Sequence, residues 1–236
     1  MDLQLRLSAA AALKHLKEDE ACADDPLLWL CNYTYTRDDH WAEKGTEPYA
    51  RFPRKPYMPM LFYLLQTSKN LLVPKSREMM LSWAVIGYLT WRAQFHGPVH
   101  ILVQCQKEEK AIDLVSGRGG VPGYTRCLYE SQPDWMKLMH PTPKPPHEQP
   151  GLIFTWSNGS RIQGIPAGAE QIRQYHPACY FADEAAFLDD WEGSIGAALP
   201  VAGQLISVSS AAPSAFGDEC MRMLDLPDEP DGSDEP

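Results

Sequence analysis

The sequence predicts an α/β fold with a mostly parallel central sheet flanked by helices. Apolar runs of strand length alternate along the chain with helical patterns, and connections of that kind produce parallel sheets. The chain has 236 residues and is 44% hydrophobic, which is enough for one sizeable core. No apolar run approaches the roughly 18 residues that a membrane-spanning helix needs, so no contact with a membrane is expected.

Three segments follow from the distribution of apolar, charged and turn-forming residues. Residues 1–50 form an N-terminal appendage, residues 51–222 form the main domain, and residues 223–236 form an acidic tail whose composition predicts disorder. In the appendage, leucines up to Leu13 indicate a short amphipathic helix. The main domain begins with a proline-rich, extended stretch at 51–59.

Within the main domain, helical patterns and strand-length apolar runs follow one another. We expect helices at 60–67, 82–95 and 108–115, and strands at 70–74, 99–104, 152–157, 161–163, 178–182 and 204–209. The second of these helices places its apolar positions on one side. Asn158-Gly159 predicts a hairpin, because both central residues of such a turn must adopt positive φ. Residues 116–150 are rich in Gly and Pro and form a long excursion, helical around Trp135 and otherwise loop.

The charge and the cysteines limit the possible functions. A net charge of −10 argues against a chain that coats nucleic acid nonspecifically. Residues 225–236 hold six of the acidic residues, and the remaining 25 acidic and 21 basic residues give only −4, which still allows a local basic face. The six cysteines form no CxxC pair and have no histidine at zinc-ligand spacing. We therefore expect reduced thiols in a cytoplasm, with Cys179 in the core.

One predicted strand ends in two adjacent acids, Asp183 and Glu184. In a parallel sheet, the carboxyl ends of the strands form the ligand crevice. Asp183 would there bind a metal ion or a water on the metal, and Glu184 would orient and deprotonate an attacking water. Two acids after a strand would equally suit a solvated loop or a helix cap, so this motif alone leaves both interpretations open.

A second candidate site lies between the first predicted strand and the helix that follows it. A phosphate-binding loop needs backbone N–H groups at a helix N-terminus, a cation and a hydroxyl for Mg²⁺. Lys75 or Arg77 can supply the cation, and Ser82 can supply the hydroxyl. Of the pattern GxxxxGK[ST], only Ser82 matches, since Met80 and Leu81 replace the second Gly and the Lys. The alternative is an ordinary strand-to-helix junction with surface cations.

In combination, these motifs resemble the ATPase domain of tailed-phage terminase large subunits, the motors that package DNA. The resemblance is carried by Lys75-Ser76-Arg77 and Ser82, which precede an apolar strand ending in Asp-Glu-Ala-Ala. It implies a P-loop NTPase architecture of the ASCE type. The Walker A loop would be a deviant one whose lysine, Lys75, has moved to the start of the loop. Ser76 and Arg77 would also contact the nucleotide, and Asp183 would belong to Walker B.

The resemblance suggests functions for four more residues. Arg173, in the segment before the acidic strand, would act as an arginine finger on ATP bound by a neighbouring subunit. Ser209 and Ser210, at the end of the last predicted strand, would sense the γ-phosphate. Tyr57 lies where the family places its adenine-binding segment. Each has a plain alternative, namely a surface arginine, a serine-rich turn and a core tyrosine.

The implied activity is ATP hydrolysis that powers translocation of viral double-stranded DNA into a capsid. ATP and Mg²⁺ would be bound between the loop and the acidic strand end, with Ser82 and Asp183 as the metal-binding residues. The implied partners are double-stranded DNA, a portal protein and a terminase small subunit. The assembly would be a homo-oligomeric ring in the host cytoplasm that transiently joins the procapsid portal vertex. Arg118, Arg126 and Lys137 are candidate DNA contacts.

Two other functions stay open at this stage. One is another helicase-like motor ATPase, although helicases normally retain Gly-Lys-Thr in the loop. The other is a catalytically inactive remnant with a structural or DNA-docking function, which the retention of Lys75, Ser82, Asp183 and Glu184 disfavours. No nuclease activity is expected from this chain, because its acidic tail cannot supply the metal-binding core of the RNase H-like domain that usually follows in the family.

Overall fold

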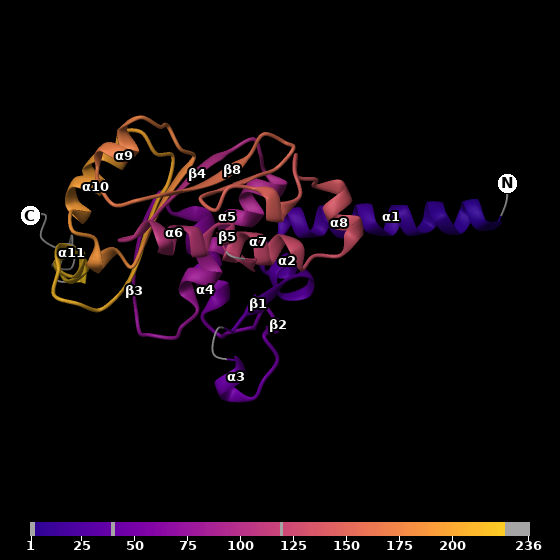
Figure 1. Ribbon diagram of the computed structural model, residues 1–236, viewed down its shortest axis with the longest axis horizontal. Coiled ribbons are helices and arrows are strands. Elements are labelled where there is room, and N and C mark those ends of the chain that lie inside the picture. The colour runs from indigo at the N-terminus through magenta and orange to yellow at the C-terminus, as the bar shows by residue number, and fades with distance from the viewer. Residues whose placement is uncertain (1–2, 39–40, 119, 225–236) are drawn as a thin grey trace, which may run out of the picture.

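Six strands form the central sheet of the computed structural model, which describes residues 3–38, 41–118 and 120–224. The strands are β3 (Asn70–Lys75), β4 (His100–Gln104), β7 (Ile153–Thr155), β8 (Arg161–Ile165), β9 (Cys179–Asp183) and β10 (Leu205–Ser210). Their order across the sheet is β3-β10-β9-β4-β8-β7, and each neighbouring pair is parallel except β7 with β8. The predicted α/β class with a mostly parallel sheet is confirmed (Figure 1).

The strands β7 and β8 form the hairpin that Asn158-Gly159 predicts. The two strands pair in antiparallel fashion, with Thr155 opposite Arg161. Gly159 has a φ of 88°, a conformation that glycine adopts without a steric penalty. β7 is shorter than the expected stretch at 152–157, because the turn already begins at Trp156.

The register of the parallel strands brings their carboxyl ends to one edge of the sheet. Ser210 of β10 lies beside Lys75 of β3, and Val208 lies beside Asp183 of β9. All five residues of β9 are buried. Because parallel strands point the same way, Lys75, Asp183 and Ser210 all reach the same crevice.

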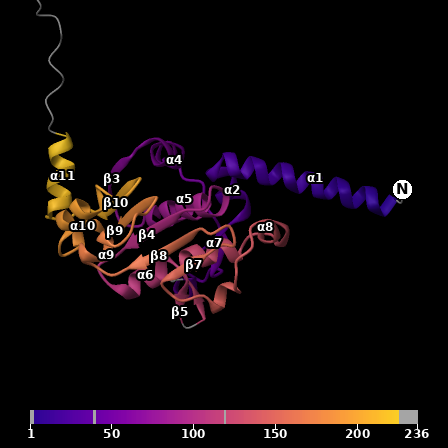
Figure 2. The same cartoon turned by 90° about the horizontal axis from the view of Figure 1, so that it is seen from above.

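Helices cover both faces of the sheet (Figure 2). Of the helices predicted at 60–67, 82–95 and 108–115, the second, α5 (Leu81–Phe95), departs from expectation, since it is buried on nearly all sides rather than on one. Its outer side is covered by three further helices, and helices that are apolar all round are typical of such a position. One face of the sheet shares a core with α5, α2 (Pro26–Tyr33), α4 (Met58–Thr67), α6 (Glu108–Leu114) and α7 (Tyr124–Glu130), and the other with α9 (Glu170–Arg173), α10 (Trp191–Ala198) and α11 (Ala215–Leu224).

The N-terminal part of the chain contributes to this core. α1 (Leu3–Asp24) is a continuous helix of 22 residues, longer than the short helix expected, and it extends away from the body of the molecule (Figures 1 and 2). Trp29 and Leu30 of α2 are fully buried in the core that contains α5. The division drawn at residue 51 stays a prediction. The next elements are β1 (Tyr35–Arg37), α3 (Trp41–Lys44) and β2 (Tyr49–Arg51), and β1 pairs with β2.

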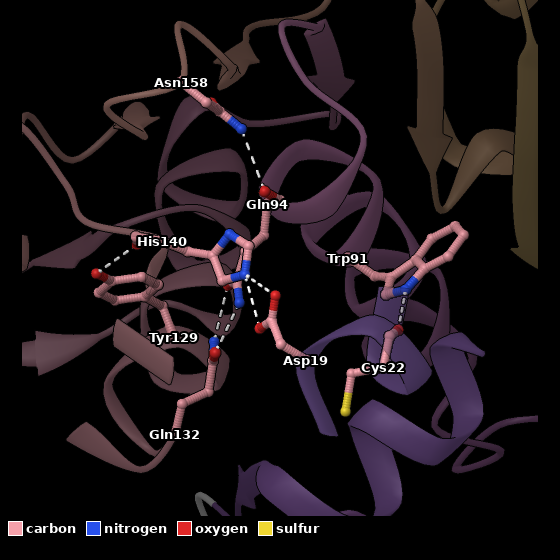
Figure 3. A network of polar contacts seen from close by, with 8 residues as sticks. All are labelled: Asp19, Cys22, Trp91, Gln94, Tyr129, Gln132, His140 and Asn158. Carbon is pink, nitrogen blue, oxygen red and sulfur yellow. Dashed lines mark hydrogen bonds and ion pairs between the residues drawn. The ribbon is translucent and has the colours of Figure 1, made fainter. Parts of the chain in front are cut away.

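Polar contacts hold the C-terminal half of α1 against the body (Figure 3). Asp19 Oδ1 lies 2.9 Å from Nε2 of His140, and both side chains are largely buried. The indole N–H of Trp91 on α5 donates to the carbonyl oxygen of Cys22 at 2.7 Å. These contacts fix the end of α1 to elements that are far from it in the sequence.

The excursion at 116–150 is built from short elements. α7 packs against α5, where the rings of Trp83 and Tyr124 stack with centroids 3.7 Å apart. The predicted helix around Trp135 is confirmed by α8 (Asp134–Met139). The remaining elements are β5 (Gly117–Arg118), β6 (Val121–Pro122) and η1 (Pro146–Glu148).

Other sequence-based expectations have mixed outcomes. Within the described ranges, no helix is both long and apolar enough to cross a membrane. The six cysteines are free, and Cys179 is fully buried as predicted. Residues 225–236, which make up most of the predicted acidic tail, lie outside the described residues. The predicted end of the main domain at 222 falls inside α11, which continues to Leu224.

Candidate functional site

The loop cation and the strand-end acid meet at the carboxyl edge of the sheet. Lys75, the last residue of β3, donates from Nζ to Oε1 of Glu184 at 2.9 Å, and its side chain is only 8% exposed. The Oγ of Ser210 lies 3.5 Å from the same Nζ. Residues 109 positions apart therefore form one cluster, as the crevice argument predicts.

The second pair joins Ser82 and Asp183. The hydroxyl of Ser82, in the first turn of α5, donates to Oδ1 of Asp183 at 2.7 Å. Burial raises the pKa of Asp183 to about 6, and the hydrogen bond from Ser82 opposes that rise. A buried carboxylate with few protein donors has unused acceptor capacity, which is what a cation or a water on a cation requires.

Glu184 is held in one position by three neighbours. Besides Lys75, the backbone N–H of Ser210 donates to its Oε2 at 3.3 Å, and the Ser209 hydroxyl lies 3.5 Å from the same oxygen. Burial by itself would raise the pKa of Glu184, but the hydrogen bonds from Lys75 and from the Ser210 backbone outweigh it and leave the pKa below its usual value. Glu184 is consequently an ionised carboxylate in a fixed orientation.

Three residues around the crevice have left-handed backbone conformations, which non-glycine residues seldom adopt. Their φ angles are 62° at Glu78, 55° at Met80 and 51° at Glu184. Such conformations cost about 1–3 kcal/mol each and cluster at functional sites. Met80 stands where the common loop pattern has its second glycine, and it adopts the conformation that the glycine would allow. Met80 therefore does not force this turn away from the conformation that a glycine would take there.

A cavity of about 400 Å³ opens between the loop and the strand ends. Five of the residues expected from the sequence line it, namely Lys75, Arg77, Asp183, Glu184 and Ser210. Five more lining residues were not expected: Glu78, Cys105, Gln106, Lys110 and Phe187. Three of these follow β4, and only the knowledge that β4 lies beside β9 would have placed them at the site.

The remaining expected site residues do not line this cavity. Ser76 is exposed on the loop, and Ser209 is buried behind Glu184, where its Oγ accepts from the backbone N–H of Ala186 at 3.0 Å. The hydroxyl of Tyr57 donates to the carbonyl oxygen of Met79, so this side chain supports the loop.

Arg173 is exposed at the end of α9. Within the described ranges it forms neither an ion pair nor a contact with this cavity, and its function in a neighbouring subunit stays a prediction.

The candidate DNA contacts are exposed or half-buried cations in the excursion. Their assignment to DNA stays a prediction. In this structure each is engaged by a carboxylate of the same chain: Arg118 by Glu109 and Asp113, Arg126 by Glu130, and Lys137 by Asp134.

The oxygen donors of the site fit Mg²⁺ that arrives with phosphates. Mg²⁺ prefers oxygen ligands and usually takes only one or two from the protein, with waters and substrate phosphates completing the set. The Ser82 hydroxyl and the Asp183 carboxylate are such a pair. The described residues contain no group of three or more His, Cys, Asp or Glu side chains placed to hold a metal ion.

Comparisons with known proteins find structural likeness without sequence likeness. No protein-family model and no curated protein matches the chain. Among solved structures, the chain is similar to the bacteriophage HK97 large terminase, with a TM-score of 0.56 and 10% identity, covering 86% of this chain and 42% of that chain.

Two further similar structures come from Thermus phage P74-26. They are its large terminase ATPase domain (TM-score 0.43, 11% identity, 77% of this chain and 72% of that chain) and an arginine-to-alanine mutant of that domain (TM-score 0.45, 13% identity, 77% and 73%).

The chain shares the fold of the HK97 large terminase. The resemblance that the motifs suggested is thus confirmed at the level of the fold, a six-stranded and mostly parallel sheet flanked by helices. The likeness covers less than half of the HK97 terminase, so it concerns the sheet domain described above.

Proposed function

We propose that the chain is an ATP-hydrolysing motor domain that powers translocation of viral double-stranded DNA into a capsid. The observation that carries the proposal is the convergence of Lys75 and Ser82, from the loop, on Glu184 and Asp183, from the end of β9. A cation, a hydroxyl, a metal-binding carboxylate and a fixed carboxylate base are the groups that phosphoryl transfer to water requires. The terminase-like fold supports the same proposal.

Each group has a defined function in this mechanism. Lys75 leaves Glu184 and neutralises charge on the bound triphosphate, while the N–H groups at the start of α5 face the phosphates. Ser82 and Asp183 would hold Mg²⁺, which would neutralise phosphate charge when bound. Glu184 orients a water and accepts its proton as the water attacks the terminal phosphorus. Ser210, which contacts both Lys75 and Glu184, is placed to respond when that pair separates.

The proposed motor works as an assembly. Arg173, exposed on α9, would stabilise the transition state at the site of a neighbouring subunit in a homo-oligomeric ring. Portal protein, terminase small subunit and double-stranded DNA are the proposed partners, and the host cytoplasm and the procapsid portal vertex are the proposed locations. An isolated chain should then hydrolyse ATP slowly.

Two other functions predict different behaviour. A helicase-like motor would be stimulated by single-stranded nucleic acid without a portal. An inactive remnant would release no phosphate. The ionised and immobilised state of Glu184 favours an active site, because it supplies the base that hydrolysis needs.

The rate of phosphate release from Mg-ATP tests the proposal. The parent, Glu184→Gln and Glu192→Gln are compared over a range of protein concentrations, each with and without portal-bearing capsids and duplex DNA. Removing the base should lower turnover by about 100-fold or more while nucleotide binding is retained. Glu192 is exposed on α10, away from the cavity, and its substitution should have no effect. If the parent never exceeds Glu184→Gln, the chain is not an ATPase.

A further inference from the structure

A third cation faces the cavity from the side opposite the loop. β4 lies next to β9 in the sheet, so the residues that follow β4 reach the edge that also carries Glu184. Among them, Cys105 and Lys110 line the same cavity as Lys75. Lys110 is in the first half of α6, a helix that packs against β4 and β8 rather than against the loop.

Three of the charged side chains that line the cavity affect the pKa of one thiol, that of Cys105, and this supports the placement of Lys110 at the cavity. Burial raises the pKa of the Cys105 thiol well above its usual range, and the nearby Asp183 carboxylate raises it further. The Lys110 ammonium opposes them, and Glu184 acts in the same direction as Asp183. The Lys110 ammonium and the two carboxylates thus act on the same thiol, and all four groups line the one cavity.

Lys110 has no carboxylate partner in the described part of the chain, unlike Lys75. The side chain is exposed. Of the three acids on α6, Glu109 and Asp113 form ion pairs with Arg118, and Glu108 forms none with Lys110 among the described residues. Of the three carboxylates that line the cavity, Glu184 is engaged by Lys75 and Asp183 by Ser82, and Glu78 forms no ion pair with Lys110 in the described part of the chain. An anion that enters the cavity would find this ammonium group uncommitted.

The charge balance of the cavity calls for such a cation. Three of its lining side chains are cationic and three are anionic, so their formal charges cancel. A magnesium-bound nucleoside triphosphate adds about two negative charges, and the developing charge at the terminal phosphate is what an enzyme must stabilise. Without Lys110, the three anionic side chains would outnumber the two remaining cations.

The order of the strands says which phosphate Lys110 would meet. In the proposed function, the loop after β3 receives the nucleotide and Glu184, at the end of β9, positions the attacking water. β4 and α6 lie on the far side of β9 from β3. A triphosphate that extends from the loop towards Glu184 therefore brings its terminal phosphate, and no other, towards α6.

We propose that Lys110 contacts the terminal phosphate of the nucleoside triphosphate from within the same subunit, across the cavity from Lys75. This assignment rests on the proposed nucleotide function of the site. It gives the cavity a means of distinguishing triphosphate from diphosphate. It also makes part of the charge neutralisation independent of a neighbouring subunit and of Arg173.

Calorimetric binding of Mg-ATPγS and Mg-ADP tests the assignment in the full chain, with Lys110→Ala, Lys110→Arg and Lys107→Ala. Lys107 is the matched control, since it is an exposed lysine at the start of α6 that does not line the cavity. Loss of one partly exposed ionic contact should weaken ATPγS binding of Lys110→Ala roughly five- to tenfold and ADP binding less than about twofold. The arginine variant should recover most of the ATPγS affinity, and Lys107→Ala should match the parent.

The outcomes separate this assignment from the proposed function. If the parent binds both nucleotides and Lys110→Ala binds each of them as tightly as the parent does, Lys110 does not contact phosphate, although the site still binds nucleotide. Equal losses for ATPγS and ADP, or an equal loss in Lys107→Ala, would show a general charge effect and overturn the assignment. A parent that binds neither nucleotide would overturn the proposed function as well.

Discussion

Substitution of Lys75 by alanine should weaken Mg-ATP binding while leaving the fold intact. Lys75 is the cation at the start of the loop, and in this structure its Nζ is 2.9 Å from Glu184 Oε1. Nucleotide must therefore take Lys75 away from an existing partner. The expected loss of binding free energy is the free energy of the Lys75–phosphate contact minus that of the Lys75–Glu184 contact.

Both terms can be estimated from the surroundings. A hydrogen bond from a charged group contributes about 1.5–3 kcal/mol, which bounds the contact between Lys75 and phosphate. The Glu184 side chain is 40% exposed, so the ion pair given up is screened and contributes about 0–1 kcal/mol. The net loss is about 0.5–3 kcal/mol, which corresponds to binding roughly 2- to 150-fold weaker.

The assay is titration calorimetry of Mg-ATP into the parent, Lys75→Ala and Lys69→Ala. Lys69 is an exposed lysine immediately before the other end of β3, so its substitution removes the same charge from the opposite edge of the sheet. Thermal unfolding should be nearly unchanged in both variants. The reasoning is refuted if the parent binds ATP and Lys75→Ala binds within about twofold of it, or if Lys69→Ala loses as much affinity.

Three further predictions concern stability. Because the pKa of buried Asp183 is raised to about 6, its contribution to stability is present at pH 4 and is lost as the pH rises through about 6. In Mg²⁺-free buffer, Asp183→Asn should therefore gain stability over the parent with rising pH, by up to about 3 kcal/mol at pH 7.5. A difference in melting temperature that does not change with pH would contradict this. Leu30→Ala should lower the free energy of unfolding by about 2–5 kcal/mol in denaturant, because Leu30 is fully buried. Leu138→Ala, at an 80% exposed position, should change it by less than about 0.5 kcal/mol. Similar losses for both variants would show that the core is misplaced. Asp19→Ala should cost about 1 kcal/mol and expose α1 to protease, since it removes the contact with His140; unchanged proteolysis would show that α1 is held by other means.

The secondary structure was largely predictable because it depends on local pattern. The apolar run that became β9 and the run that became β10 were each placed within one residue of their observed bounds, since a buried parallel strand is apolar along its whole length. The same reasoning understated the burial of α5, because apolar residues on one side of a helix do not reveal how many neighbours cover the other. The length of α1 was also missed.

The site was predictable only where its residues carry motifs. Glu184 and Lys75 were paired through a resemblance, and their distance depends on the strand order, which no local pattern contains. Lys110 was missed for the same reason. The glycine-like conformation of Met80 could not be foreseen either, because it is imposed by the turn into α5 and is unfavourable for that side chain. Long-range geometry therefore supplied what composition and spacing did not.

The most direct test of the central claim is a crystal structure of the chain with Mg²⁺ and ATPγS. The account predicts phosphates in the cavity between the loop and the end of β9, with Mg²⁺ at Ser82 and Asp183. Lys75 Nζ should lie within about 3 Å of a phosphate oxygen and should no longer contact Glu184. Nucleotide bound elsewhere, with the Lys75–Glu184 pair intact at 2.9 Å, would contradict the account.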